Sequence, residues 1–188
     1  MACASVDFSG INGACDINRG GIKRIYIANK SDVDAIERNK SNGNIEVITM
    51  KEGKKFISWT FRNNTASFTT SSNADNSLGT QGGTATLSLQ FTRADNVKRA
   101  EIERTLQAEM YVIVETPYTD EDTENGPYCH YFVMGFDTYV TAENVVMQTG
   151  TAISDLNGYT IDLVENYYNL PPFIDTSQVT IKDIVDEV

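Results

Sequence analysis

Short segments in which apolar and polar residues alternate are the feature that most constrains how this chain can fold. The clearest are Lys23–Asn29, Ile45–Met50, Thr84–Thr92 and Met110–Thr116, and stretches rich in Gly, Asn, Asp and Ser join them. A period of two places successive side chains on opposite faces of a strand. Each segment therefore predicts a β-strand with one buried face.

One stretch departs from this pattern and predicts an α-helix at about residues 95–108. Asp95 or Asn96 provides the N-cap. Ile102 and Leu106, four residues apart, form a narrow apolar stripe that should face a sheet, while the remaining surface is charged. We therefore expect a mainly β protein, a β-sandwich or barrel with this one helix packed against it.

Two further segments carry predictions about local structure. In Lys55–Phe61 the face formed by Ile57, Trp59 and Phe61 should be buried, and Trp59 should be a core or interface anchor. The segment Ser31–Gly43 offers a cap and a turn of helix before the Asn-Gly pair ends it.

The chain shows no repeat or linker, so its 188 residues predict a single domain, 1–188. Residues 1–22, with recurrent glycines, are expected to form an N-terminal arm. Residues 62–83, rich in Asn, Ser, Thr and Gly, predict a long polar hairpin loop, in which 66–70 either extend the preceding strand or form a projecting hairpin arm. Residues 169–188 predict a C-terminal extension that ends in a strand.

Charge restricts the possible partners. The chain has 26 acidic and 15 basic residues, a net charge of −11, which disfavours nucleic-acid binding through a basic cleft. This charge fits simple solubility, and it also fits a surface past which DNA moves without sticking. No apolar run approaches the roughly 20 residues of a membrane helix, and the first residues lack a signal-peptide pattern, so no membrane anchor is expected.

An acidic turn contains the only metal-site candidates. Asp120, Asp122 and Glu124 stand at alternate positions, as ligands do in a calcium loop. However, Asn125 and Tyr131 occupy the positions at which an EF-hand requires Gly and Glu. A solvated acidic turn with no bound metal is therefore the expected structure.

Catalysis is also not expected. His130 is the sole histidine, and its neighbour Cys129 would point to the opposite face of a strand, so the two cannot share a proton. The chain has three cysteines, Cys3, Cys15 and Cys129. An odd number of cysteines without a CxxC pair suits a reducing cytosol. Phosphate-binding glycine motifs are absent. We expect neither an enzyme nor a cofactor.

Two segments carry a resemblance to a known family. Residues 150–163, GTAISDLNGYTIDL, resemble the closing part of bacteriophage tail tube proteins, in which a polar turn with Asp and Gly leads into a terminal strand. The opening ACDINRGGIKRIYIANKSDV is similar to structural proteins of phages of gut Bacteroides, including the crAss-like group. The order of elements from about Lys23 to Leu163 is similar too.

The resemblance implies a virion structural protein, assembled in the host cytoplasm. Its subunits would join their sheets into a ring, commonly a hexamer, and the rings would stack into a tube with an acidic lumen for DNA passage. The partners would be further copies of the chain, other phage tail proteins, and DNA that passes without specific binding. As candidates for contacts between subunits we expect Trp59, Phe61, Phe68 and Leu78.

Two alternatives remain open. A phage tail ring, connector or hub protein would use the same fold without polymerising into a tube. A β-sandwich of another class would bind carbohydrate or protein through an aromatic platform of Tyr118, Tyr128, Tyr167 and Tyr168.

Overall fold

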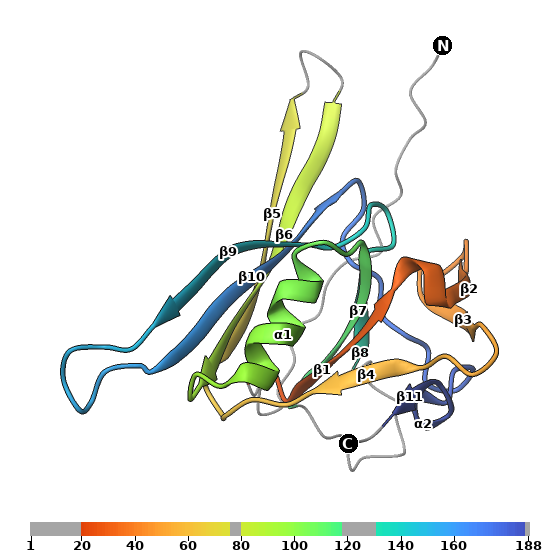
Figure 1. Cartoon of the computed structure of the whole chain (residues 1–188). Coiled ribbons are helices and arrows are strands. Elements are labelled where there is room, and N and C mark those ends of the chain that lie inside the picture. Colours follow the sequence, from red (N-terminus) through yellow and green to blue (C-terminus); the bar gives the residue numbers. More distant parts are fainter. Residues whose placement is uncertain (1–19, 76–79, 118–130, 187–188) are drawn as a thin grey trace.

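A computed structural model of the chain describes residues 20–75, 80–117 and 131–186 (Figure 1). The mainly β character expected from the alternating segments is confirmed. The strands are β1 (Arg24–Asn29), β2 (Val33–Arg38), β3 (Ile45–Met50), β4 (Phe56–Trp59), β5 (Ala66–Asp75), β6 (Thr80–Thr92), β7 (Met110–Glu115), β8 (Tyr131–Met134), β9 (Thr141–Gln148), β10 (Gly158–Tyr167) and β11 (Val185–Asp186). The helices are a 3-10 turn η1 (Lys30–Asp32), α1 (Asn96–Thr105) and the short α2 (Ile181–Ile184).

The strands form three sheets. A five-stranded sheet, which we call the central sheet, has the order β11-β4-β1-β7-β8. A four-stranded sheet with the order β5-β6-β10-β9 contains the longest strands, and we call it the long sheet. The pair β2–β3 forms the third. All pairings are antiparallel except that of β11 with β4.

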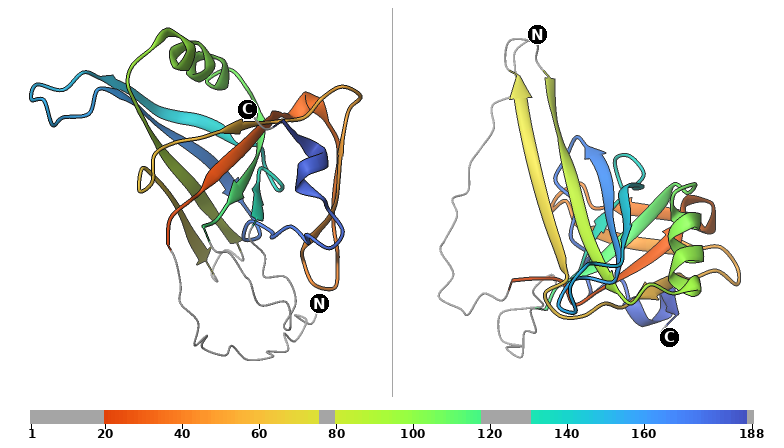
Figure 2. Two further views of the ribbon diagram at one scale, coloured as in Figure 1. Left: turned by 90° about the horizontal axis from the view of Figure 1, so that it is seen from below. Right: turned by 60° about the vertical axis from the view of Figure 1, so that its left-hand side comes forward.

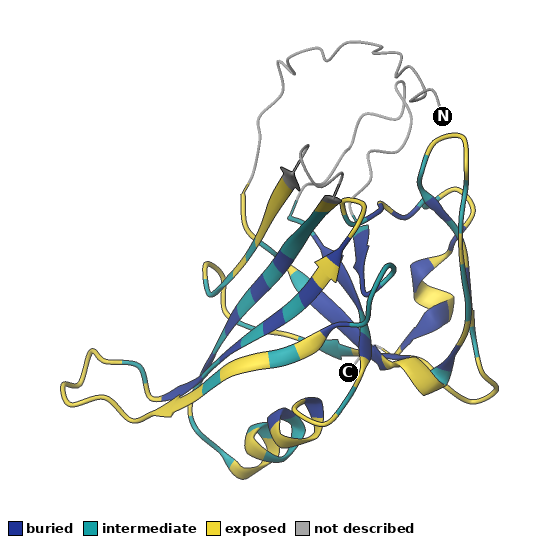
Figure 3. Ribbon diagram, turned by 90° about the horizontal axis from the view of Figure 1, so that it is seen from above, coloured by how far each residue is buried: buried dark blue, intermediate teal, exposed yellow. Residues whose placement is uncertain are grey.

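The first core lies between the central sheet and the long sheet. Ile25 and Val112 contribute to it from the central sheet, while Leu87 and Leu163 contribute from the long sheet. These four side chains are completely buried. The burial of β6 and β10 on alternate residues follows directly from their sequence pattern, and it leaves the other face of the long sheet toward solvent (Figure 3).

A second core covers the opposite face of the central sheet. Tyr26 and Phe56 are buried there against residues of β3 and of the C-terminal segment, including Ile174 and Val185. Backbone hydrogen bonds hold the segment in place, with the Ile45 amide donating to Phe173 and the Ile174 amide donating to Tyr131. The predicted C-terminal extension, 169–188, is therefore built into the fold up to residue 186, and its predicted strand is a turn of helix followed by β11.

Residues 62–83, predicted as a long polar hairpin loop, do form a hairpin, but mostly as paired strands and not as a loop. Most of this segment belongs to β5 and β6, which pair without a break from Ala66 with Leu89 to Asp75 with Thr80. The two strands project together beyond the rest of the molecule (Figure 2). Backbone pairing forms this hairpin arm, and the side chains described in its outer part, Ser71, Ser72, Asn73 and Gln81, are exposed, so the strands need little apolar surface. The alternative of a projecting hairpin arm is the one observed.

Helix α1 begins as predicted, because the Asp95 side chain accepts a hydrogen bond from the Lys98 amide at 2.9 Å. Only half of its predicted stripe is correct. Ile102 is buried, but Leu106 is 51% exposed, and the buried neighbour of Ile102 is Thr105. The buried face predicted for Ile57, Trp59 and Phe61 is correct in part. Trp59 and Phe61 pack against the first core, but Ile57 is 54% exposed, and Phe56 on the other face of β4 is fully buried.

The remaining difference concerns Ser31–Gly43, where a turn of helix was predicted. The turn is limited to η1, and the chain continues as β2, which pairs with β3. Val33 is buried and Ile36 packs partly against the second core, so this strand buries one narrow row of side chains. Its charged residues weaken the apolar alternation that would have identified it.

A tyrosine packed over a glycine holds the base of the projecting hairpin arm. The Tyr167 ring crosses Gly83, and its hydroxyl lies 2.7 Å from Ser72 Oγ on β5. A Cβ added at Gly83 would lie 2.6 Å from Tyr167 Cζ and would also meet the Ser71 carbonyl oxygen. At Gly82 the nearest atom, the Tyr167 carbonyl oxygen, would lie at an ordinary 3.5 Å.

We therefore expect Gly83→Ala to lower the free energy of unfolding by about 1–3 kcal/mol, since the added methyl group clashes with the Ser71 carbonyl oxygen and with the Tyr167 ring, and one of them must move. Gly82→Ala is the matched control, with an expected change of no more than about 0.5 kcal/mol. Urea unfolding midpoints of both variants measure the difference. Equal midpoints for the two variants would show that the contact between Tyr167 and Gly83 does not support the arm.

Candidate assembly surface

The solvent face of the long sheet is mostly polar, with Val164 on β10 and Val146 on β9, opposite Thr160, as its apolar members. On β6 this face carries alternate residues from Thr84 to Thr92, and they lie opposite the even-numbered residues of β10. Most of these side chains bear hydroxyl or amide groups. The members on the two central strands are Thr84, Thr86, Ser88, Gln90, Thr92, Thr160, Asp162, Val164 and Asn166.

No lysine or arginine lies in β5, β6, β9 or β10, all of which the structure describes. The charged side chains of the polar face are instead carboxylates. Asp162 accepts hydrogen bonds from Ser88 Oγ at 2.6 Å and from Asn144 Nδ2 at 3.0 Å, so it is fixed near the middle of the face. Glu143 on β9 pairs with Asp162 in the register and is exposed. The face is therefore neutral to negative, and a polyanion finds no cation on it.

The long sheet ends in two strands that pair on one side only within the described ranges, β5 and β9. On β5 the direction of the free groups follows from the register. The Gln90 amide donates to the carbonyl of Thr65, the residue just before β5, and the register places these two residues opposite each other. In an antiparallel pair, hydrogen-bonded and non-bonded residue pairs alternate, so the odd-numbered residues of β5 bond to β6. The amides and carbonyls of Phe68, Thr70 and Ser72 therefore point away from the sheet.

Among the residues that the structure describes, the β5 edge lacks the usual devices that prevent pairing with another chain. Monomeric proteins protect such edges with lysine, proline, bulges or short strands. Strand β5 has 10 residues, contains neither Lys nor Pro, and pairs with β6 without a register shift. The opposite edge is less regular, because β9 has a register shift near Asn144, whose φ is 49°. An uninterrupted, unprotected edge on β5 is suited to accept a strand of another subunit.

One carboxyl group lies on the core side of the long sheet. Glu165 of β10 is 2% exposed, and burial raises its pKa to about 7, although backbone N–H groups of Gly135, Asp137 and Thr138 donate hydrogen bonds that lower it. Its Oε2 atom has no hydrogen-bond partner among the described residues. The group joins β10 to the turn after β8, next to the base of the projecting hairpin arm.

The raised pKa makes the stability of this region depend on pH. A group whose pKa is higher in the folded than in the unfolded protein stabilises the fold when protonated. The contribution of Glu165 is complete below its ordinary pKa and is lost as the pH rises through about 7. Between about pH 5 and about pH 8, the urea midpoint of the wild type should therefore fall relative to that of Glu165→Gln.

Glu143→Gln is the matched control for this experiment, because Glu143 is an exposed carboxylate on the neighbouring strand. Its difference from the wild type should change little between the two pH values. If the difference in urea midpoint between Glu165→Gln and the wild type is the same at both pH values, Glu165 does not bind a proton in this range.

Three of the four predicted contact residues contact aromatic side chains of the same subunit. Trp59 lies edge-on to Phe91 with ring centroids 5.5 Å apart, and Phe61 contacts the same ring at 6.5 Å. Phe68 packs on Phe132 at 4.5 Å. All three are only partly buried. The fourth, Leu78, lies outside the described residues, and a role of these residues between subunits stays a prediction.

The other sequence candidates are not brought together. Asp120, Asp122 and Glu124 lie outside the described residues, as do Cys129 and His130. Within the described ranges no three His, Cys, Asp or Glu side chains gather as metal ligands. No helix in these ranges is long and apolar enough to cross a membrane.

The aromatic platform of the alternative binding function is not supported at its described positions. Tyr167 is only 3% exposed and belongs to the first core, whereas Tyr168 is 66% exposed. Tyr118 and Tyr128 lie outside the described residues. Alternate orientation along the chain separates the two described tyrosines, so they do not form one surface.

The open edge of β5 and the polar face of the long sheet do not follow from the apolar alternation in the sequence. A usable signal was present in the positions of the basic residues. No lysine or arginine occurs between Arg62 and Arg93 or between Arg104 and Lys182, and these two intervals contain all four strands of the long sheet. The chain matches no protein-family model, no curated protein and no solved structure.

Proposed function

We propose that the protein is a virion structural subunit of the phage tail tube type, in which neighbouring copies join their long sheets edge to edge around a lumen. In this arrangement β5 of one subunit pairs with β9 of the next, and the polar face of the long sheet lines the channel. The observation that carries the proposal is a cation-free sheet face bounded by an unprotected edge on β5.

Edge pairing accounts for the structure of β5. Strand pairing with a second copy satisfies the outward backbone groups of Phe68, Thr70 and Ser72, which otherwise depend on water. The two edges of the long sheet are different strands, so the contact is head to tail and can close into a ring. Repeated around the ring, this contact leaves no unprotected edge.

The charge of the sheet face accounts for passage of DNA. Binding to DNA depends on lysine and arginine side chains that displace counterions from phosphates. A lumen lined by hydroxyls, amides and the carboxylates of Asp162 and Glu143 provides none of these cations. DNA can then slide through without being held, and the subunit acts by geometry and electrostatics without a chemical step.

Electron microscopy of the purified full chain tests this function. The expected result is closed rings with a central channel, which stack into tubes as the protein concentration rises. Rings that never stack would favour the tail ring, connector or hub alternative. Particles that stay monomeric at high concentration would contradict both forms of the proposal.

A further inference from the structure

The strand order of the long sheet determines how a second copy can join it edge to edge. In the order β5-β6-β10-β9 every strand is antiparallel to its neighbours, so the two edge strands, β5 and β9, run in opposite directions. Rotation about a ring axis preserves the direction of each strand along that axis. In the proposed ring, β9 of one copy therefore meets β5 of the next as an antiparallel strand.

The free backbone groups of β9 follow from the register of the sheet, as they do for β5. The Arg93 amide donates to the Asn157 carbonyl just before β10, so the odd-numbered residues of β10 bond to β6. The even-numbered residues of β10 then bond to β9. Thr160 lies opposite Val146, and therefore the next residue of β9, Met147, directs its N–H and C=O groups away from the sheet.

Both edges carry their free backbone groups on residues whose side chains lie on the core side of the sheet. On β5 one such residue is Phe68, which lies opposite the buried Leu87, and on β9 it is Met147, which lies opposite the buried Tyr159. Residues that face each other across an antiparallel pair share one face of the sheet. The two edges can therefore join with the core sides adjacent and the polar face continuous.

Side-chain exposure distinguishes one register of this pairing from the others. Met147 is 57% exposed, and Phe68 is only partly buried, although its ring packs on Phe132 at 4.5 Å. When Met147 and Phe68 stand opposite each other, each covers apolar surface of the other. A thioether next to an aromatic ring adds a further attraction.

The neighbouring residue pairs fit the same register. It places Val146 opposite Thr69 and Val145 opposite Thr70, and these are β-branched side chains, which pack well across strands. A shift by two residues in either direction would place Met147 opposite an alanine or a threonine and lose its contact with an aromatic ring. The register with Met147 opposite the phenylalanine therefore buries the most apolar surface.

We propose that β9 of one copy pairs antiparallel with β5 of the next in the register that sets Met147 opposite Phe68. This inference rests on the proposed function and specifies which residues of the two edges meet. Each contact between subunits then combines a ladder of backbone hydrogen bonds with one apolar contact on the core side. Met147 covers the edge of the first core of the neighbouring subunit.

The apolar contact is tested by changing Met147. Met147→Asn should need about a tenfold higher concentration than the wild type to reach half assembly, whereas Met147→Leu should assemble as the wild type does. Ile153→Asn, at a fully exposed position in the turn between β9 and β10, is the matched control and should have no effect. If Met147→Asn assembles as readily as the wild type, Met147 does not contact Phe68.

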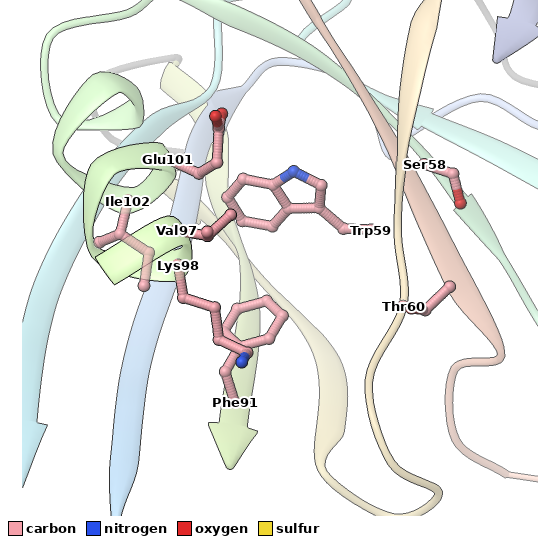
Figure 4. A pocket seen from close by; sticks show the side chains of 8 residues that line it. All are labelled: Ser58, Trp59, Thr60, Phe91, Val97, Lys98, Glu101 and Ile102. Atoms are coloured by element: carbon pink, nitrogen blue, oxygen red, sulfur yellow. The ribbon is translucent and has the colours of Figure 1, made fainter. Parts of the chain in front are cut away.

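The fold of each variant can be verified independently of assembly. Trp59 is the sole tryptophan, and it points from β4 toward α1 and lies next to Phe91 (Figure 4). It is not one of the paired residues. Each variant that is folded should therefore have the same Trp59 emission as the wild type at concentrations below assembly.

A disulfide between copies tests the register itself. In the proposed register Val146 and Thr69 form a non-hydrogen-bonded pair with Cα atoms about 4.5 Å apart, a separation that a disulfide can bridge. Within one subunit they are on opposite edge strands, separated by three strand spacings, or about 14 Å, so the disulfide joins two copies. In a background with the three natural cysteines changed to serine, Val146→Cys, Thr69→Cys should form linked oligomers when assemblies are treated with oxidised glutathione.

Two shifted pairs are the matched controls. Val146→Cys combined with Ser67→Cys or with Ser71→Cys places the cysteines about 7–8 Å apart in the proposed register, and these variants should link much less. If a shifted pair links more efficiently than Val146→Cys, Thr69→Cys, the register is wrong and the proposed function remains. If assemblies form and none of the three pairs links, β9 does not pair with β5 in this way. Wild-type protein that forms no assembly would overturn both the register and the proposed function.

Discussion

The variant Thr70→Pro should remain folded and fail to assemble. The Thr70 amide points outward from β5 and makes no bond to β6, so proline removes no hydrogen bond of the subunit itself. In the assembled state the same substitution removes one donor and places a ring against the incoming strand. We expect each subunit contact to weaken by about 2 kcal/mol or more, roughly thirtyfold, and a closed ring carries this cost at every contact.

Sedimentation velocity across a range of concentrations measures this effect, and circular dichroism verifies the fold. Thr70→Val is the matched control, because it keeps the backbone N–H and a β-branched side chain. It should assemble as the wild type does. Thr70→Pro rings of wild-type stability would show that β5 is not an assembly edge.

Lysines on the polar face should convert it from a surface that DNA passes into one that holds DNA. Thr86 and Thr160 lie on this face and are half-buried. In Thr86→Lys, Thr160→Lys each subunit of a ring adds two cations to the lumen. We expect wild-type assemblies to show no retention of duplex DNA. The double variant should bind with a logarithmic salt slope of about −0.9 for each phosphate neutralised.

Cosedimentation of assembled protein with duplex DNA at several salt concentrations makes this measurement. Thr86→Gln, Thr160→Gln controls for side-chain size without added charge. The two lysines in the Thr70→Pro background control for binding outside a ring, and this protein should retain much less DNA. If intact rings of the lysine variant retain no DNA, the polar face does not line the lumen.

The strands that bury an alternating apolar row could be predicted from the sequence. In β6, Leu87, Leu89 and Phe91 recur every second residue and all three are buried. The N-cap of α1 could also be predicted, since the Asp95 side chain accepts a hydrogen bond from the nearby Lys98 amide. In both cases the information is local, because the signal and the contact lie within a few residues of one another.

Contacts between distant parts of the chain could not be predicted in the same way. The Ile57 side chain lies on the same strand face as Trp59, and yet it is 54% exposed, which the local alternation does not indicate. The C-terminal segment packs on β3 through Ile174, which no pattern near residue 174 indicates. Burial at these positions is set by the tertiary arrangement of the sheets.

The candidate surface was harder to predict than the fold for a physical reason. Sequence patterns reveal apolar side chains that need cover, and for this reason the expected contact residues were Trp59, Phe61 and Phe68, which pack largely within the subunit. The β5 edge instead exposes backbone groups between Ser and Thr side chains. Its Ser, Thr and Asn residues are typical of a loop, and only the pairing with β6 identifies the segment as a strand.

Hydrogen exchange at the β5 amides is the most direct measurement of edge pairing. In the Thr70→Pro subunit, the odd-numbered amides of Ser67, Thr69 and Ser71 should be protected by β6, and those of Phe68 and Ser72 should exchange quickly. In wild-type assemblies both sets should be protected, because the outward amides are bonded to a neighbouring strand. Outward amides that exchange equally fast in intact wild-type assemblies would contradict the joining of subunits through β5.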